Sequence, residues 1–485
     1  MKKTLLFILF PLLSIGQAQI GTDIDGKDYK DYSGSSVSLS SDGSVLAIGA
    51  PNKVSYTHSI SKVRVYKKIS GVWTQLGADI DGDADGDESG SSVSLSSDGS
   101  VVAIGVFRNI NYSHYVRIYK NVSGVWTQLG ANIVGETNDD QSGSSVSLSS
   151  DGSIVAIGAP FNSGNGTSSG QVRVYKNVSG VWTQLGADID GEAAYDESGY
   201  SVSLSSDGSV VAIGAELNAE NGFNSGQVRV YKNVSGVWTQ IGADINGEAA
   251  GDHSGHGVAL SSDGSVVAIG AFFNDENGID SGQVRVYKNV SGVWTQIGAD
   301  IDGEAAYDES GSSVSISSDG SVVAIGGPEN DGNGLSSGQV RVYKNVSGVW
   351  TKLGADINGE AIGDRSGYSV ALSSDGSMVA IGAPYNDENG LSSGQVRVYD
   401  LSVVLSSDSF VMANFAVYPN PASEVVKINL QEDLMLEKVN IYNTLGQLVK
   451  TEKNNTISVS YLSKGSYFFE VITDKGKATK TILVQ

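Results

Sequence analysis

The sequence predicts an all-β protein: a seven-bladed β-propeller followed by a small antiparallel β-sandwich. Three observations lead to this fold class. The string SSDGS occurs seven times between residues 19 and 400, in most cases 56 residues apart. Each copy contains four short strand-like runs separated by turn residues. From Phe415 the repeat ends and period-2 runs such as VVKINL and TKTILV continue to the C-terminus. The repeated aspartates are Asp42, Asp98, Asp151, Asp207, Asp263, Asp319 and Asp375.

One copy, starting at Asp300, illustrates the expected blade. Val314 and Ile316 alternate with serines, as in a strand with one buried face. An Asp-Gly hairpin signal leads into the second run, VVAIG. A long loop rich in Gly, Asn and Asp precedes the third run, QVRVYK, and a short NVSG turn leads to the fourth, GVWTKLGADI. This order places the short turns at one face of the disc and the long loops at the other.

The last copy lacks its fourth strand, because GVWT occurs six times and the other three runs seven times. The segment from Gln19 to Ile24 resembles the end of that strand, so we expect it to complete the seventh blade and close the ring. Residues 401–406 are an alternative source, or the two segments share the position. An open solenoid is the competing architecture.

The chain divides into four predicted parts. Residues 1–18 have the basic start, apolar run and small-residue end of a signal peptide. Residues 19–400 form the propeller, 401–414 a linker and 415–485 the C-terminal domain. No later apolar run is long enough for a transmembrane segment.

Composition excludes several classes of function. The net charge of −23 would repel nucleic acid. The absence of cysteine removes disulfides, thiolate nucleophiles and thiolate metal sites. Most acidic residues outside the SSDGS turns fall in the long loops, which predicts a negatively charged face.

The repeat resembles the FG-GAP repeat of integrin-α-type propellers. The match lies in SGxSVxLSSDGSxVAIGAP, in GQVRVY and in GVWTQLGADI, and extends over residues 19–400. The resemblance implies a seven-bladed ring. Members that bind Ca²⁺ carry a DxDxDG loop between the first two strands; the hairpin here is SSDGS, so that site is not carried over.

The C-terminal part resembles the sorting domain of the type IX secretion system. The matching pieces are Tyr418-Pro-Asn-Pro421, IYNTLGQ, LSKGSYFFEV and KATKTILVQ. The resemblance implies that residues 415–485 are recognised by the type IX secretion machinery. It also implies that the protein is secreted or displayed on the outer-membrane surface.

One long loop is a candidate cation site. Asp81, Asp83, Asp85 and Asp87 alternate in the pattern that begins an oxygen-ligand calcium loop. Ser92 occupies the position where a bidentate glutamate would be expected, and the corresponding loops of other copies do not keep the spacing. Ca²⁺ is the cofactor this loop would bind; the alternative is an ordinary solvated loop.

A candidate binding patch comes from comparing the copies with one another. Copies three to seven share an Asn/Gly-rich loop between the second and third strands, whereas the first two copies differ. Tyrosine and arginine are frequent in interface hot spots. The alternative is sequence drift in terminal blades. The patch comprises Tyr56, His58, Phe107, Arg108, Tyr112, His114 and Tyr115.

No catalytic motif is found: HExxH and phosphate-binding loops are absent from the sequence, and the GxSxG pattern occurs only in the repeated Gly/Ser-rich loops, as GTSSG at 166–170 and GLSSG at 334–338 and 390–394, which are not strand-to-helix turns. The repeated Arg and Trp occur in nearly every copy, so we expect them to pack between blades. The sequence therefore favours a secreted or cell-surface binding or adhesion module with an extracellular glycan or protein ligand, and not an enzyme. The alternatives are an extracellular hydrolase that uses long-loop carboxylates and a structural surface or matrix protein.

Overall fold

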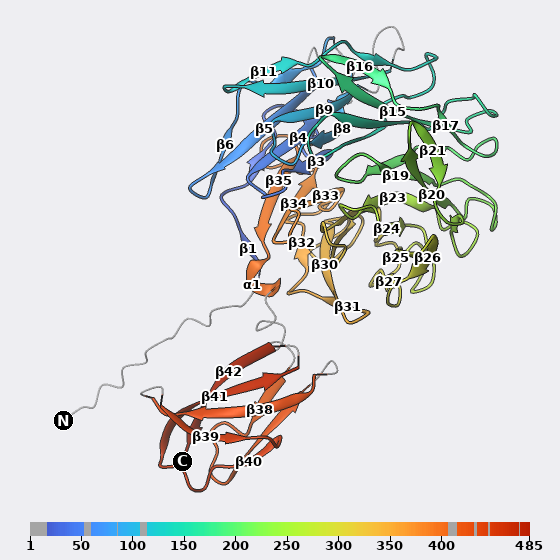
Figure 1. Cartoon of the computed structure of the whole chain (residues 1–485). Coiled ribbons are helices and arrows are strands. Elements are labelled where there is room, and N and C mark those ends of the chain that lie inside the picture. The colour runs from blue at the N-terminus through green and yellow to red at the C-terminus, as the bar shows by residue number, and fades with distance from the viewer. Residues whose placement is uncertain are drawn as a thin grey trace. The chain divides into compact units, whose positions relative to one another are not determined.

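The computed structural model describes residues 17–52, 60–84, 86–106, 114–405, 415–430, 434–444, 447–474 and 476–485 (Figure 1). Most of the predicted signal peptide and residues 406–414 of the predicted linker lie outside these ranges. Two compact units are present, one spanning Ala18–Asp400 and the other containing Leu401–Gln485.

The first unit is a propeller of seven antiparallel sheets in consecutive strand order. Blade 1 contains β3 (Ser36–Leu39), β4 (Val45–Ala50), β5 (Lys62–Ile69), β6 (Val72–Gln75) and β7 (Ile80–Asp81). Blade 2 contains β8 (Ser89–Leu95), β9 (Val101–Val106), β10 (Tyr115–Val122), β11 (Val125–Gln128) and β12 (Ile133–Val134). Blade 3 contains β13 (Ser145–Leu148), β14 (Ile154–Ala159), β15 (Gln171–Val178), β16 (Val181–Gln184) and β17 (Ile189–Asp190).

The remaining blades repeat this pattern. Blade 4 contains β18 (Ser201–Leu204), β19 (Val210–Ala215), β20 (Gln227–Val234), β21 (Val237–Gln240) and β22 (Ile245–Asn246). Blade 5 contains β23 (Ser254–Leu260), β24 (Val266–Ala271), β25 (Gln283–Val290), β26 (Val293–Gln296) and β27 (Ile301–Asp302). Blade 6 contains β28 (Ser313–Ile316), β29 (Val322–Gly327), β30 (Gln339–Val346), β31 (Val349–Lys352) and β32 (Ile357–Asn358). Blade 7 contains β33 (Ser369–Leu372), β34 (Met378–Ala383) and β35 (Gln395–Asp400).

Blade 7 is completed by the N-terminal segment, as predicted. Strand β1 (Ala18–Gln19) pairs with β35 through Ala18 and Asp400, and β2 (Ile24–Asp25) pairs with it through Ile24 and Val396. The alternative segment does not supply the strand: residues Ser402–Leu405 form the short helix α1. The ring is therefore closed by residues from opposite ends of the repeat region.

The SSDGS turns form a second closure at the short-turn face. Each turn donates a backbone N–H to the carbonyl of the turn in the next blade, from Ser41 to Ser97 and onward. The seventh turn, at Ser374, donates to Ser41 at 2.9 Å. These seven bonds form a complete circle around the propeller axis, which an open solenoid could not form. They hold the blades close to the axis at this face.

The repeated Arg and Trp join neighbouring blades, which confirms their predicted role. Arg229 is 5% exposed and donates to the carbonyl of Asp190 at 2.9 Å, across the interface between blades 3 and 4. Trp238 of blade 4 donates to the carbonyl of Leu185 at 2.7 Å. A buried cation that meets fixed carbonyl dipoles gains more than an exposed one, so these contacts hold the blades in register.

The second unit is a small antiparallel sandwich. One sheet contains β36 (Phe415–Tyr418), β37 (Val425–Leu430) and β40 (Thr456–Ser458). The other contains β38 (Leu436–Tyr442), β39 (Leu448–Glu452), β41 (Gly465–Thr473) and β42 (Gly476–Val484). Both sheets bury alternate residues in one core around Val426, Val439 and Phe469, because in-out alternation leaves one apolar face on each strand.

Candidate functional site

The long-loop end of the propeller axis is where the repeats stop being alike. The loops that join the second and third strands of a blade, and those that join successive blades, emerge at this face. The residue directly before each repeated Ser-Gly is one of five different types in the seven copies, whereas the strands around it are nearly identical. These residues are Tyr32, Glu88, Gln141, Glu197, His253, Glu309 and Arg365.

All seven of these residues adopt a left-handed backbone conformation, with φ between 43° and 54°. This conformation costs a non-glycine residue roughly 1–2 kcal/mol. Glycine would relieve the cost, yet each copy has a large or charged side chain instead. Strained backbone with varied side chains is typical of functional sites, so this ring is a candidate for ligand recognition.

A pocket of about 270 Å³ lies inside this ring. It is lined by Glu88, Ser91, Gln141, Ser144, Pro160, Phe161, Tyr200 and Tyr368. Tyr200 belongs to blade 4 and Tyr368 to blade 7, which are not neighbours, so the pocket lies across the axis. We call it the axial pocket.

A cluster of histidine, glutamate and aromatic side chains lies beside the pocket. Glu216 replaces the proline found at the same place in four other copies and is 8% exposed. Its Oε2 atom lies 2.6 Å from Nδ1 of His256 and 3.8 Å from Nδ1 of His253. The His256 ring lies 4.9 Å from the ring of Tyr200. The cluster thus connects the pocket wall to a buried carboxylate.

The two glutamates near this cluster titrate in opposite directions. Burial raises the pKa of Glu197 to about 7, and the negative charge of Glu216 adds to the effect. Burial also opposes ionisation of Glu216, but the hydrogen bond with His256 and the nearby His253 imidazole outweigh it and lower the pKa of Glu216. One carboxyl therefore retains a proton near neutral pH while its neighbour is ionised.

A second carboxyl with a raised pKa lies farther around the ring. Burial raises the pKa of Glu309 to about 7, followed by the charge of Glu329. Glu329 is itself paired with Arg365 at 2.7 Å, and the Arg365 guanidinium lies 5.0 Å from the ring centre of Tyr385. We call the axial pocket and the ring of seven residues around it the mouth. In the mouth, aromatic side chains therefore alternate with charged groups that have defined partners.

The predicted calcium loop has structural partners at two of its positions. Asp83 accepts hydrogen bonds from Arg117 at 2.8 Å and from the Tyr115 hydroxyl at 2.7 Å. Asp87 is buried and accepts the backbone N–H groups of Asp83 and Ala84. Asp81 is exposed, and Asp85 lies outside the described residues. Calcium binding by this loop stays a prediction.

The predicted patch of blades 1 and 2 falls largely outside the described residues. This holds for Tyr56, His58, Phe107, Arg108 and Tyr112. The two described members are buried: His114 accepts the backbone N–H of Gln141 at 3.1 Å, and Tyr115 is bound to Asp83. These two side chains support the loop framework, and ligand binding by the other five stays a prediction.

Comparison with known families agrees with the architecture. Residues 356–399 match the FG-GAP repeat, and residues 416–485 match the secretion system C-terminal sorting domain. A domain of the latter kind indicates export through the type IX system and a secreted or surface location. None of the helices in the described part of the chain has the length and apolarity needed to cross a membrane.

Individual relatives are distant. The ulvan lyase NLR42 of Nonlabens ulvanivorans is 32% identical over 111 residues, which is 21% of this chain and 21% of that protein. The hydrazine synthase of Kuenenia stuttgartiensis has a similar structure, with a TM-score of 0.50, 13% identity and coverage of 80% of this chain and 98% of that one. The periplasmic gluconolactonase PpgL of Pseudomonas aeruginosa gives a TM-score of 0.46 at 17% identity and covers 67% and 87%. These structures share the fold alone.

Proposed function

We propose that this chain, an FG-GAP-repeat propeller with a type IX sorting domain, is an exported binding module whose ligand enters the axial pocket. The observation that carries the proposal is the concentration of side-chain variety in the long loops around the axis, which include the strained ring. Random sequence drift would vary exposed positions throughout the blade. The outer-strand sequence YKNVSGVWT is instead identical in copies three to six.

The chemistry of the mouth favours a neutral glycan as the ligand. Tyr200, Tyr368 and Phe161 offer aromatic surface on which a sugar ring can stack. Glu88 and Gln141 supply hydrogen-bonding groups for hydroxyls. A polyanion is disfavoured, because the ring carries three glutamates and only one arginine. The volume of the axial pocket is sufficient for one or two sugar residues. A protein ligand with a flat surface would not fill it.

A glycan-binding screen on the purified chain tests this proposal. Replacing both Tyr200 and Tyr368 by Ala should weaken binding roughly 30-fold or more, since each stacking contact contributes on the order of 1–2 kcal/mol. The matched control is Tyr195→Ala, which removes a 65% exposed tyrosine that does not line the pocket. Unchanged affinity in the double variant would reject the axial pocket. Ordered self-assembly without glycan binding would favour a structural surface protein instead.

A second candidate function is glycoside hydrolysis. It is favoured by the opposite titration of Glu197 and Glu216, because an acid and an ionised carboxylate are the groups that such chemistry needs. In such a reaction, Glu197 would donate the proton to the leaving group. Turnover of a bound glycan that is lost in Glu197→Gln, with binding retained, would support the enzyme. Binding without turnover in the parent chain would support the binding module.

A further inference from the structure

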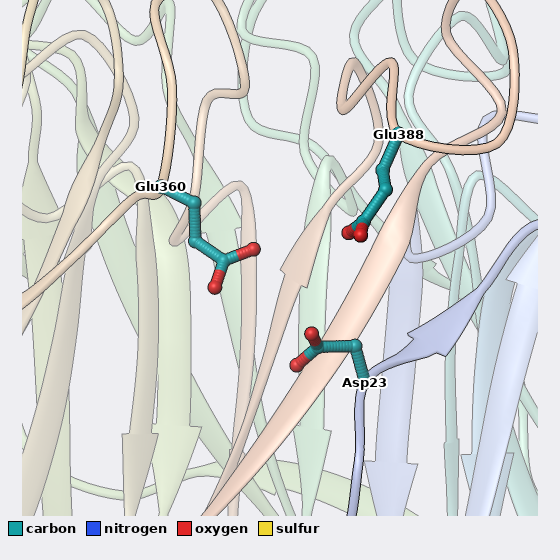
Figure 2. A group of neighbouring side chains, drawn as sticks. All are labelled: Asp23, Glu360 and Glu388. Carbon is teal, nitrogen blue, oxygen red and sulfur yellow. The ribbon is translucent and has the colours of Figure 1, made fainter.

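In the described part of the chain, three groups of carboxylates recur at equivalent positions where successive blades meet on the long-loop face. They are Glu192, Glu220 and Asp244; Glu248, Glu276 and Asp300; and Asp23, Glu360 and Glu388. Within each group, one oxygen atom from every carboxylate lies within 4.8 Å of the others. Figure 2 shows the third group, with the three carboxylates pointing toward a common space.

Each group combines three segments of chain. Glu360 follows β32 of blade 6, Glu388 lies in the loop between β34 and β35 of blade 7, and Asp23 lies between β1 and β2. The third group thus joins the N-terminal segment to two blades. The other two groups join blade 3 to blade 4 and blade 4 to blade 5 in the same way.

A buried glutamine forms the inner wall of each group. Gln227, Gln283 and Gln395 are at most 1% exposed, and each directs its side-chain amide to the carboxylates. In each of them the Oε1 atom is buried and has no hydrogen-bond partner within the described part of the chain. A half-turn of the amide would present this oxygen to the centre of the group, where only a cation would stabilise it. The same atom is unpartnered at Gln171 of blade 3, beside Glu136.

Blade 6 shows how the fold compensates when one carboxylate is missing. Gly332 replaces the middle glutamate there, and Lys352 replaces the glutamine found at Gln240 and Gln296. The Lys352 ammonium lies 2.8 Å from Asp356 and 3.6 Å from Glu304, the two remaining carboxylates. In this blade the protein itself supplies the positive charge.

The charge in the three complete groups is only partly balanced. Arg229, Arg285 and Arg397 each approach one glutamate of a group, at 3.5, 3.5 and 3.7 Å. Three carboxylates and one guanidinium leave two formal negative charges.

We propose that each of the three groups binds one hard divalent cation of the Ca²⁺ type, which joins adjacent blades and, at Asp23, fastens the N-terminal segment. Oxygen ligands from side chains of different loops, with open solvent on one side, suit the irregular coordination that Ca²⁺ accepts better than the strict octahedron of Mg²⁺. These sites lie in the long loops, at the opposite face from the SSDGS hairpins, and do not include residues 81–87. They are also separate from the axial pocket.

Calorimetric titration of the EDTA-treated full chain with CaCl₂ tests the proposal. We expect about three sites with dissociation constants in the range of extracellular calcium modules, about 10⁻⁴ to 10⁻³ M, and a higher Tm in Ca²⁺. The triple variant Glu220→Gln, Glu276→Gln, Glu388→Gln should lose the binding heat and the Tm increase. The matched control Glu304→Gln, at the lysine-filled position of blade 6, should keep both.

Two further variants distinguish these three groups from the aspartate loop at residues 81–87 as the place where Ca²⁺ binds. Gly332→Glu combined with Lys352→Gln should rebuild the group in blade 6 and add one site. Asp85→Asn should leave the titration unchanged, because the loop at residues 81–87 is not involved. Full binding in the triple variant, or loss of all binding in Asp85→Asn, would overturn the proposal. So would the absence of heat up to about 10 mM CaCl₂.

Discussion

Glu197 and Glu216 show how neighbouring carboxyls acquire different protonation in one small region. Glu197 follows the strained loop into blade 4 and is partly buried, and among the described residues it has no cationic hydrogen-bond partner. Glu216 is more deeply buried, yet two imidazoles face it. Desolvation dominates at the first residue and hydrogen bonding at the second. Glu216, which stands where four other copies have proline, therefore adds its charge to the burial that keeps Glu197 protonated.

This arrangement predicts a pH dependence of stability. The folded-state pKa of Glu197, about 7, lies above the ordinary value of 4.5. Its contribution is therefore fully present below about pH 4.5 and is lost as the pH rises through 7. We expect the free energy of unfolding to fall by on the order of 1 kcal/mol between pH 6 and 8, after allowance for solvent screening. The groups facing Glu197 are Glu216 and His253.

Denaturant unfolding of the parent and of Glu197→Gln at pH 6, 7 and 8 measures this effect. In the variant, the decrease in the free energy of unfolding between pH 6 and 8 should be about half of the decrease in the parent or less, because the amide does not titrate. Glu304→Gln, which lies outside the mouth, should follow the parent curve. If the free energy of unfolding changes with pH in the same way in the parent and in Glu197→Gln, burial does not raise the pKa of Glu197.

At the scale of elements, the second strand of each blade sets the distance between blades. Gly214 of β19 faces the carbonyl oxygen of Gly255 in the next blade, and a Cβ atom added to Gly214 would lie 2.0 Å from that oxygen. The same approach recurs at Gly49, Gly158, Gly270, Gly326 and Gly382, with contacts of 2.0 or 2.1 Å. The glycine of VAIG is therefore required by the packing of backbone against backbone, not by a turn.

We therefore expect Gly214→Ala to destabilise the propeller by about 3 kcal/mol or more, since neither backbone can move without disturbing its own sheet. Gly164→Ala is the matched control: its added Cβ would meet only side-chain atoms, 3.0 Å or more away. The corresponding position in blade 4 already carries Glu220. Thermal unfolding of both variants checks the prediction, and a similar Tm for the two would contradict it.

At the scale of the whole molecule, some features can be predicted from the repeated sequence and others cannot. Strand order, the role of the Arg and Trp, and closure by Gln19–Ile24 all follow from local periodicity and from counting the copies. The axial pocket does not, because Tyr200 and Tyr368 are 168 positions apart and only the closed ring brings them together. A signal for the pocket is present in the sequence, because the residue before each Ser-Gly varies between copies whose strands are nearly identical. The patch predicted in the first two copies includes His114 and Tyr115, which are buried and support the loops, and binding by its other five residues stays a prediction.

Closure of the ring depends on a segment that the chain connects to blade 1 and not to the blade it completes. Strand β2 is held to β35 mainly by Ile24, which is 7% exposed and packs against Val396 and Val398. If β2 detaches, the edge of β35 becomes free to pair with another chain. The equivalent strand in blade 3, β17, is anchored by Ile189, which is 4% exposed, but it directly follows β16 of its own blade in the chain.

Ile24→Ala and Ile189→Ala should therefore have similar effects on stability but different effects on association. Each removes a buried side chain, at a cost of about 2–4 kcal/mol. Only Ile24→Ala should also release an edge, so we expect concentration-dependent dimers or larger species for this variant, while Ile189→Ala stays in the same state as the parent. Sedimentation velocity at several concentrations, with the Tm of each variant, distinguishes the two. Equal association of both variants would mean that the edge of blade 7 is no weaker than the others, and that the N-terminal segment closes the ring as firmly as an internal strand.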